Sequence, residues 1–397
     1  MMKNSACILW LEGVNPEMLS AVPGLAELAQ EGVDIRLTPL PLVEKSVCYY
    51  QTLTGMGAGK LGRFDATYPE AYAARAEEGM PEGALGHLLP DILRARKSPV
   101  IFLEARDAGA LYALAEQPYD CAIVRFDARA ADEHSLETIV QHCRNMKNPE
   151  THLLVLTDVC RPEPHTLVNS NDFLADVGLL EVGESRCRDD IVWHETLAYG
   201  LGQGQIWVNL RGREQQGCVS SHHEYQEVCD ALIDELRTGW LDPDSHEPVV
   251  ERVLRKEEAY HGDYLFKAPD LIVAYRPGYA ASPRARQLDF DGTGMRRSGS
   301  PVSAVEQPPY GRLLAIGPGL ASGFSGTASL LDVMPSMLYL LGQSIPVNVD
   351  GTIITSMFTK AYCRQTPVER VGDAESALSA EDEGLIVDRL RALGYLG

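Results

Sequence analysis

The sequence predicts an α/β fold in which a doubly wound, mostly parallel sheet carries helices on both faces. Between residues 7 and 156, short apolar runs alternate with segments of helical length, which is typical of strands joined by crossover helices. One run, Leu153–Leu156, is uninterrupted and ends at Thr157 and Asp158, as expected of a strand buried on both faces. Because ligands bind beyond the carboxyl ends of the strands in such sheets, Asp158 marks the expected site.

The individual elements are expected in the following places. Strands are expected over residues 7–11, 32–41, 99–104, 121–126, 152–156, 206–210, 249–256, 271–275 and 313–316. Helices are expected over residues 16–30, 43–62, 84–96, 111–116, 135–146, 223–238, 330–341 and 384–393. No separate cap domain can be delimited, so we expect a single domain over 1–397, with an excursion over 160–260 and a long loop near the site over 287–310.

Composition excludes several classes of partner. The net charge of -21 argues against a nucleic acid or an anionic membrane, because phosphate groups are held mainly by Lys and Arg. The nine cysteines are scattered without a CxxC pair, which is typical of reduced thiols. The apolar run Cys7–Leu11 is too short for a signal peptide, and no run approaches the length of a membrane span. We therefore expect a cytoplasmic protein with no nucleic-acid or membrane partner.

Several segments, taken together, resemble a known family. They lie at residues 209–214, 268–273, 315–319, 331–336 with 350–351, and 390–395, and read NLRGRE, APDLIV, AIGPG, LDVMPS with DG, and LRALGY. In this order they resemble the alkaline phosphatase superfamily, specifically its bacterial type I phosphodiesterase and nucleotide pyrophosphatase-like branch. The resemblance implies an alkaline phosphatase-like fold in which two divalent metals, usually zinc, activate a Thr or Ser nucleophile against a phosphate ester.

The resemblance can be followed residue by residue from the N-terminus. The family's first metal ligand, an Asp that ends the first strand, corresponds to Glu12. The family's nucleophile, counted back from Thr54, corresponds to Lys45, with Ser46 one position away. A Lys amine cannot serve as the usual phosphate acceptor beside two cations, so only a shifted register would give Ser46 that role.

The other metal-ligand positions are also altered. The family's Asp and His pair corresponds to Ala130 and His134, and its adjacent Asp and His correspond to Asp158 and Val159. The last family ligand is a His close to the strand at 313–316, but His261 is the final histidine of the chain. One metal site would therefore keep only His134.

The leading hypothesis is a member of this superfamily that has lost two-metal hydrolysis. Glu12 and Asp158 could hold one divalent ion (Mg, Ca or Zn), or no cofactor is bound and Lys45 neutralises the two carboxylates in place of a metal. As a partner we expect either a small phosphate-type ligand or a protein.

Two alternatives remain open. One is a hydrolase or transferase on phosphate-type substrates with a rebuilt, metal-poor site, using Ser46, Cys48 or Cys160 as nucleophile and His134 as base. The other is a scaffold or assembly protein that uses the inherited cleft or a surface. Metal analysis and assays with phosphate esters discriminate among the three hypotheses.

Overall fold

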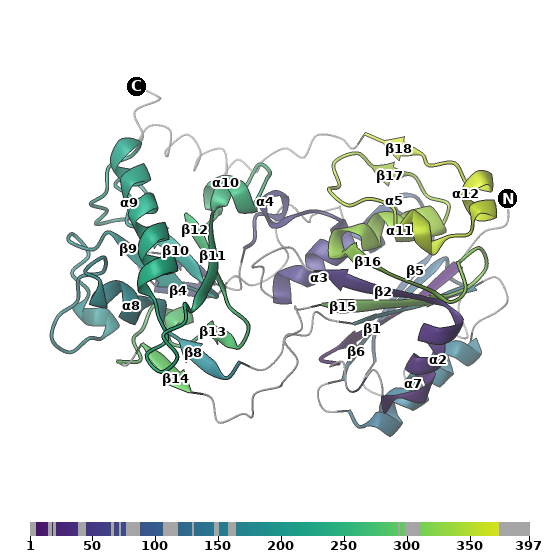
Figure 1. Ribbon diagram of the computed structural model, residues 1–397. Coiled ribbons are helices and arrows are strands. Elements are labelled where there is room, and N and C mark those ends of the chain that lie inside the picture. Colours follow the sequence, from purple (N-terminus) through teal and green to yellow (C-terminus); the bar gives the residue numbers. More distant parts are fainter. Residues whose placement is uncertain are drawn as a thin grey trace.

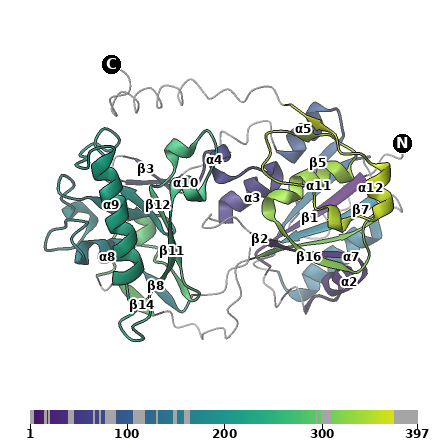
Figure 2. The same ribbon diagram turned by 45° about the horizontal axis from the view of Figure 1, so that its top comes forward.

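The computed structural model has two lobes, which are visible in Figure 1 and again in the tilted view of Figure 2. One lobe is built around a seven-stranded sheet, and the other, formed from residues 164–292 and 294–297, around two smaller sheets. The structure describes residues 5–14, 18, 21–38, 45–64, 67–70, 73–76, 88–105, 118–128, 131–146, 151–157, 164–292, 294–297 and 310–372.

The seven-stranded sheet confirms the predicted fold class. Its order is β16 (Phe324–Ser329), β2 (Val33–Thr38), β15 (Gly311–Ile316), β7 (Thr151–Thr157), β1 (Ser5–Glu12), β6 (Cys121–Asp127) and β5 (Val100–Ala105). Within this sheet, β15 runs antiparallel to both of its neighbours, and the other neighbouring pairs are parallel. The sheet is therefore mostly parallel.

Helices cover both faces of this sheet. Because side chains alternate along a strand, β1 divides its residues between two apolar cores. Its even-numbered residues from 6 to 10 belong to the core under α3 (Lys45–Thr54), α5 (Leu89–Ala95) and α11 (Val333–Leu340). Its odd-numbered residues from 7 to 11 belong to the core under α2 (Pro23–Glu31) and α7 (Glu133–Met146). The two helical layers are seen on either side of the sheet in Figure 1.

The second lobe is built on an antiparallel sheet. Its order is β11 (Val250–Arg255), β12 (Leu271–Tyr275), β10 (Gln205–Val208) and β9 (Ala198–Leu201). Against it pack α8 (Ser170–Asp176) and α9 (His223–Asp234), the latter continued by a π-helical turn, η4 (Glu235–Gly239). A three-stranded sheet of β13 (Tyr279–Ala281), β8 (Thr166–Val168) and β14 (Met295–Arg297) completes the lobe.

Two details differ from the predicted elements. The buried strand at 271–275 lies in the second lobe and not in the large sheet. The segment 287–310, predicted as a long loop, contains β14, which pairs with β8. The predicted helices at 111–116 and 384–393 lie outside the described residues, and the predicted domain boundaries stay a prediction.

A close backbone crossing joins the two lobes. The short helix α4 (Ala58–Leu61) follows α3, and the Tyr264 N–H donates to the carbonyl of Gly59 at 2.9 Å. Gly262 has a φ of +132°, and a side chain there would meet the backbone of Gly59. Apolar residues close the junction around this crossing: Met56, Ala58, Leu61, Phe64, Tyr260, Ala268 and Ile272. The chain that leaves α3 is therefore fixed against the second lobe.

The remaining elements are short. They are β3 (Thr67–Glu70), β4 (Ala73–Ala76), η3 (Arg188–Asp190), α10 (Lys256–Ala259), η5 (Leu265–Lys267), η6 (Ala285–Gln287), η7 (Leu330–Asp332), β17 (Ile345–Pro346), η8 (Thr355–Met357), α12 (Lys360–Gln365) and β18 (Arg370–Val371). Among the helices of the described residues, none is long and apolar enough to cross a membrane.

Candidate functional site

Three charged side chains lie together at the carboxyl edge of the large sheet. The parallel register pairs Trp10 of β1 with Arg125 of β6, and Arg125 with Glu104 of β5. Glu12 lies two residues beyond Trp10, so strand alternation turns it to the same face. This is the face covered by α3, which contributes Tyr49. We call Glu12, Arg125, Glu104 and Tyr49 the carboxyl-edge cluster.

Arg125 holds the carboxyl-edge cluster together. Its Nε donates a hydrogen bond to Glu12 Oε1 at 2.5 Å, and its Nη1 lies 3.4 Å from Glu104 Oε1. The Tyr49 ring packs against the guanidinium, 5.5 Å from its Cζ, and against Trp10 with 5.0 Å between the ring centroids. Glu12 is 16% exposed, whereas Glu104 is 71% exposed. The pair with Glu12 is therefore the shielded one, and water weakens the pair with Glu104.

The electrostatics of the cluster favour a charged Arg125 and a neutral Tyr49. The hydrogen bond with Glu12 is the main cause that raises the pKa of Arg125, with burial opposing it. Burial raises the pKa of Tyr49 to about 12, although the nearby Arg125 charge lowers it. At neutral pH the cluster therefore presents a guanidinium and an uncharged phenol, and Tyr49 cannot act as a base there.

Of the two predicted metal ligands, the structure describes only Glu12. Asp158 lies outside the described residues, and Thr157 before it pairs with Leu11, the residue before Glu12. Arg125 engages Oε1 of Glu12, so a guanidinium already supplies a counter-charge to this carboxylate. Among the residues that the structure describes, no three His, Cys, Asp or Glu side chains gather in a way that could hold a metal. These residues do not fit a two-metal centre, and the single ion between Glu12 and Asp158 stays a prediction.

The other predicted residues lie as follows. The backbone of Lys45 and Ser46 forms the start of α3, whereas their side chains and the whole of Cys160 lie outside the described part of the chain. Cys48 is 5% exposed and belongs to the apolar core, where a dissolved substrate does not reach it. His134 is exposed in the first turn of α7. The catalytic roles given to Lys45, Ser46 and His134 stay predictions.

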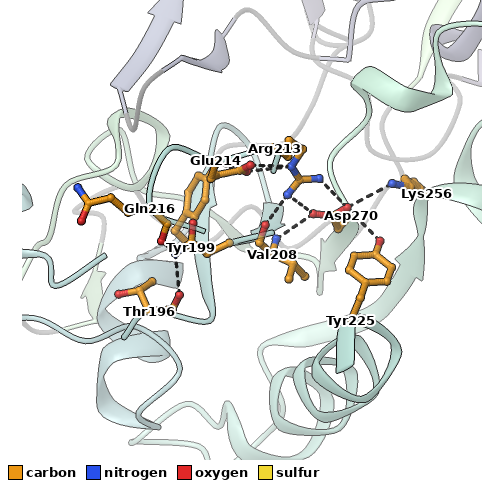
Figure 3. Close-up of polar contacts among 10 residues, drawn as sticks. Thr196, Tyr199, Val208, Arg213, Glu214, Gln216, Tyr225, Lys256 and Asp270 are labelled. Carbon is orange, nitrogen blue, oxygen red and sulfur yellow. Dashed lines mark hydrogen bonds and ion pairs between the residues drawn. The ribbon is translucent and has the colours of Figure 1, made fainter. Parts of the chain in front are cut away.

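A second group of charges is buried in the other lobe, just before β12 and in the segment after β10 (Figure 3). Arg213 donates to both carboxylate oxygens of Asp270, with Nη1–Oδ1 at 2.9 Å and Nη2–Oδ2 at 2.7 Å. Asp270 also accepts hydrogen bonds from the Tyr225 hydroxyl at 3.0 Å and the Val208 N–H at 2.8 Å, and Lys256 Nζ lies 3.3 Å away. Both oxygens of this fully buried carboxylate are therefore occupied.

Glu214 extends this network on the other side of Arg213. The Arg213 Nε lies 2.9 Å from each Glu214 oxygen, and the Tyr199 hydroxyl donates to Glu214 at 3.0 Å. Burial alone would raise the pKa of Asp270, but Arg213 and Lys256 outweigh burial and hold it well below its usual range. The network joins β9, β10 and β12 through satisfied polar groups, so its role is to stabilise the lobe.

Sequence reasoning missed Arg125 and Tyr49, although one signal was present. Arg125 is the charged residue inside the otherwise apolar run Cys121–Phe126, and a strand in the middle of a sheet rarely carries an unpaired charge. The identity of its partner depends on the register between β1 and β6, which the sequence does not reveal. The pair Arg213 and Asp270 lies within two of the segments that carry the family resemblance.

The fold is similar to that of murine ectonucleotide pyrophosphatase/phosphodiesterase 5. In a structure of its inactive variant in complex with AMP, the match covers 90% of this chain and 100% of that chain, at 12% identity and a TM-score of 0.55. In a second structure of the same murine protein, the match covers 89% of this chain and 100% of that chain, at 11% identity and a TM-score of 0.53. No protein-family model and no curated protein matches the sequence.

The likeness, at this identity, concerns the fold alone. The chain has an alkaline phosphatase-like α/β fold, as the sequence predicts, and shares it with this murine protein. The bacterial branch and the loss of the metal-ligand positions stay predictions.

Proposed function

We propose that this chain is a phosphodiesterase-like protein that has lost two-metal phosphoester hydrolysis and instead binds a small phosphate-type ligand at the carboxyl edge of its large sheet. One observation carries the proposal. Glu12, which corresponds to the family's first metal ligand, is paired with Arg125 at 2.5 Å. The cation beside this carboxylate is thus a side chain of the protein.

The physical reason is that a carboxylate near the end of a buried strand needs a counter-charge. A metal supplies one in the two-metal phosphohydrolases, where each ion needs several Asp and His ligands. A guanidinium that hydrogen-bonds the same carboxylate supplies the charge but offers no open coordination position and no activated water. Arg125 therefore neutralises Glu12 without the chemistry that a metal would bring.

A cytoplasmic location belongs to the same proposal. The cysteines of the described residues are all free thiols, which supports a reducing compartment. The proposed ligand would then be an intracellular phosphate compound.

Metal analysis and hydrolysis assays of the full chain test the proposal. The protein is purified without chelator, its zinc, magnesium and calcium are measured, and it is assayed with p-nitrophenyl phosphate and bis-p-nitrophenyl phosphate, with and without added zinc. We expect less than about one metal ion per chain and no hydrolysis above the background. About two zinc ions per chain, with hydrolysis that a chelator abolishes, would refute the proposal.

The same assays separate the enzyme alternative. Hydrolysis that persists in chelator and is lost in Ser46→Ala or Cys160→Ala would indicate a rebuilt catalytic site in place of a binding protein. His134→Ala distinguishes a base from an exposed surface histidine, because only the loss of a base shifts the pH profile.

A further inference from the structure

We propose that Arg125 is the anion-binding residue of the carboxyl-edge cluster and that it holds the phosphoryl group of a small phosphate ester without a metal ion. This inference rests on the proposed function, since it assigns that function's ligand to one side chain. It further predicts how each carboxylate beside Arg125 affects binding.

Arg125 carries more N–H donors than its two neighbouring carboxylates use. A guanidinium carries five N–H donors in a planar fork, which matches two oxygens of a phosphate. Glu12 takes the Nε donor, and Glu104 lies at the long distance of 3.4 Å from Nη1. Within the described part of the chain, no partner is found for Nη2. Among the described residues, Glu104 is thus the one competitor for the outer edge of the fork.

Arg125 holds its two carboxylate partners with different strength. Glu12 is largely shielded from water, and its hydrogen bond to Nε is short. Glu104 is 71% exposed, and such surface pairs contribute little because water and salt screen them. An incoming phosphate would therefore displace Glu104 and leave Glu12 in place, and Glu12 would keep the guanidinium oriented.

Tyr49 and helix α3 limit the direction from which a ligand can approach Arg125. The guanidinium Cζ lies over the Tyr49 ring, 5.5 Å from its centroid, so Tyr49 occupies one side of the guanidinium. Tyr49 lies one turn beyond the start of the ten-residue helix α3, whose first turn contains no acidic residue. The positive end of the α3 dipole is thus about one helical turn from Tyr49, and its field favours an anion nearby.

Isothermal titration of the full chain in EDTA tests this inference, with phenyl phosphate and inorganic phosphate as separate probes. We expect phenyl phosphate to bind in the presence of chelator, and Arg125→Ala to weaken binding about tenfold or more, because charge-assisted hydrogen bonds are lost. Glu104→Gln should instead strengthen binding by up to about fivefold, because a weak surface competitor is removed. A site that takes esters binds phenyl phosphate more tightly than inorganic phosphate, whereas equal binding of the two probes would refute the ester assignment.

A matched control exists on the surface of the same lobe. Arg94 and Asp91 of α5 form an exposed pair with the same separation of 3.4 Å, so Arg94→Ala and Asp91→Asn should leave binding unchanged. If Arg125→Ala is too unstable to assay, Arg125→Lys keeps a charge for Glu12 but loses the fork, and Glu104→Gln changes only an exposed side chain.

The outcomes separate this inference from the proposed function. Binding in EDTA that is equal in the parent protein, Arg125→Lys and Glu104→Gln would overturn the role of Arg125 and leave the proposed function intact. Binding that appears only after zinc is added would overturn both. If neither phenyl phosphate nor inorganic phosphate binds, the inference is also overturned.

Discussion

Replacing Asp270 with Asn removes one charge from a buried ion pair and should strongly destabilise the second lobe. Asp270 is fully buried and bonds both Nη atoms of Arg213, the Tyr225 hydroxyl and the Val208 N–H. Asn keeps the shape but leaves the guanidinium of Arg213, itself 9% exposed, without its main counter-charge. Removing one partner of a buried pair costs about 3–5 kcal/mol, so we expect a loss of that size in the free energy of unfolding.

Urea unfolding followed by tryptophan fluorescence measures this loss. Three of the four tryptophans, Trp193, Trp207 and Trp240, lie in the second lobe and report on it. Asp230→Asn is the matched control, because Asp230 pairs with Arg255 at 2.7 Å but is 72% exposed, and its loss should cost less than about 1 kcal/mol. If Asp270→Asn costs no more than Asp230→Asn, the reasoning from burial is wrong.

The stability difference between the parent protein and Asp270→Asn should also depend on pH, in a direction set by the pKa of Asp270. The pKa of Asp270 is held below its usual range in the folded state, so the ionised carboxylate contributes stability above its unfolded pKa of about 3.9. That contribution is lost as the pH falls from about 4 toward the folded pKa. Because Asn does not titrate, the stability difference between parent and Asp270→Asn should stay constant between about pH 7 and 5 and shrink below about pH 4. A difference that grows on acidification would contradict this assignment.

Three further predictions concern the junction and the carboxyl-edge cluster. Gly262→Ala should lower the free energy of unfolding by about 1–3 kcal/mol more than Gly178→Ala, and so give the lower thermal midpoint, because a Cβ at Gly262 meets the backbone of Gly59 and one at Gly178 meets nothing within 4 Å. Equal midpoints would contradict the close crossing. Cys48 should resist thiol labelling in the native protein and react only on unfolding, as mass spectrometry of labelled peptides would report; rapid native labelling would contradict its burial. Burial raises the pKa of both Tyr49 and Tyr339 to about 12, so spectrophotometric titration of Tyr49→Phe should show one phenol fewer near pH 12 than the parent protein. The contribution of Tyr49 to stability should be lost as the pH rises from about 10 toward 12, because folding favours the neutral phenol; an unchanged titration would contradict this.

The sequence predicts the large sheet well, because each of its buried strands can be recognised from its own residues. β1, β6 and β7 are short apolar runs, and a run buried on both faces looks the same wherever it lies in a parallel sheet. The same property explains what could not be predicted. The run Leu271–Tyr275 is as apolar as a strand of the large sheet, yet it belongs to the second lobe, because pairing depends on contacts distant in sequence. Likewise, nothing in the residues of β15 indicates that it runs antiparallel to β7.

The location of the site could be predicted from the sequence, but the side chains that interact there could not. Parallel strands bring their carboxyl ends to one edge, so Glu12 could be assigned to that edge from the sequence. Its partner could not, because the hydrogen bond between Glu12 and Arg125 spans 113 residues and depends on a register in which Trp10 faces Arg125. A shift of one residue would turn Arg125 to the opposite core, where a charge without a partner would be costly. The register that buries the apolar residues of β1 and β6 is thus the one that brings the guanidinium to Glu12, so the fold itself sets the charge that a phosphate ligand would meet.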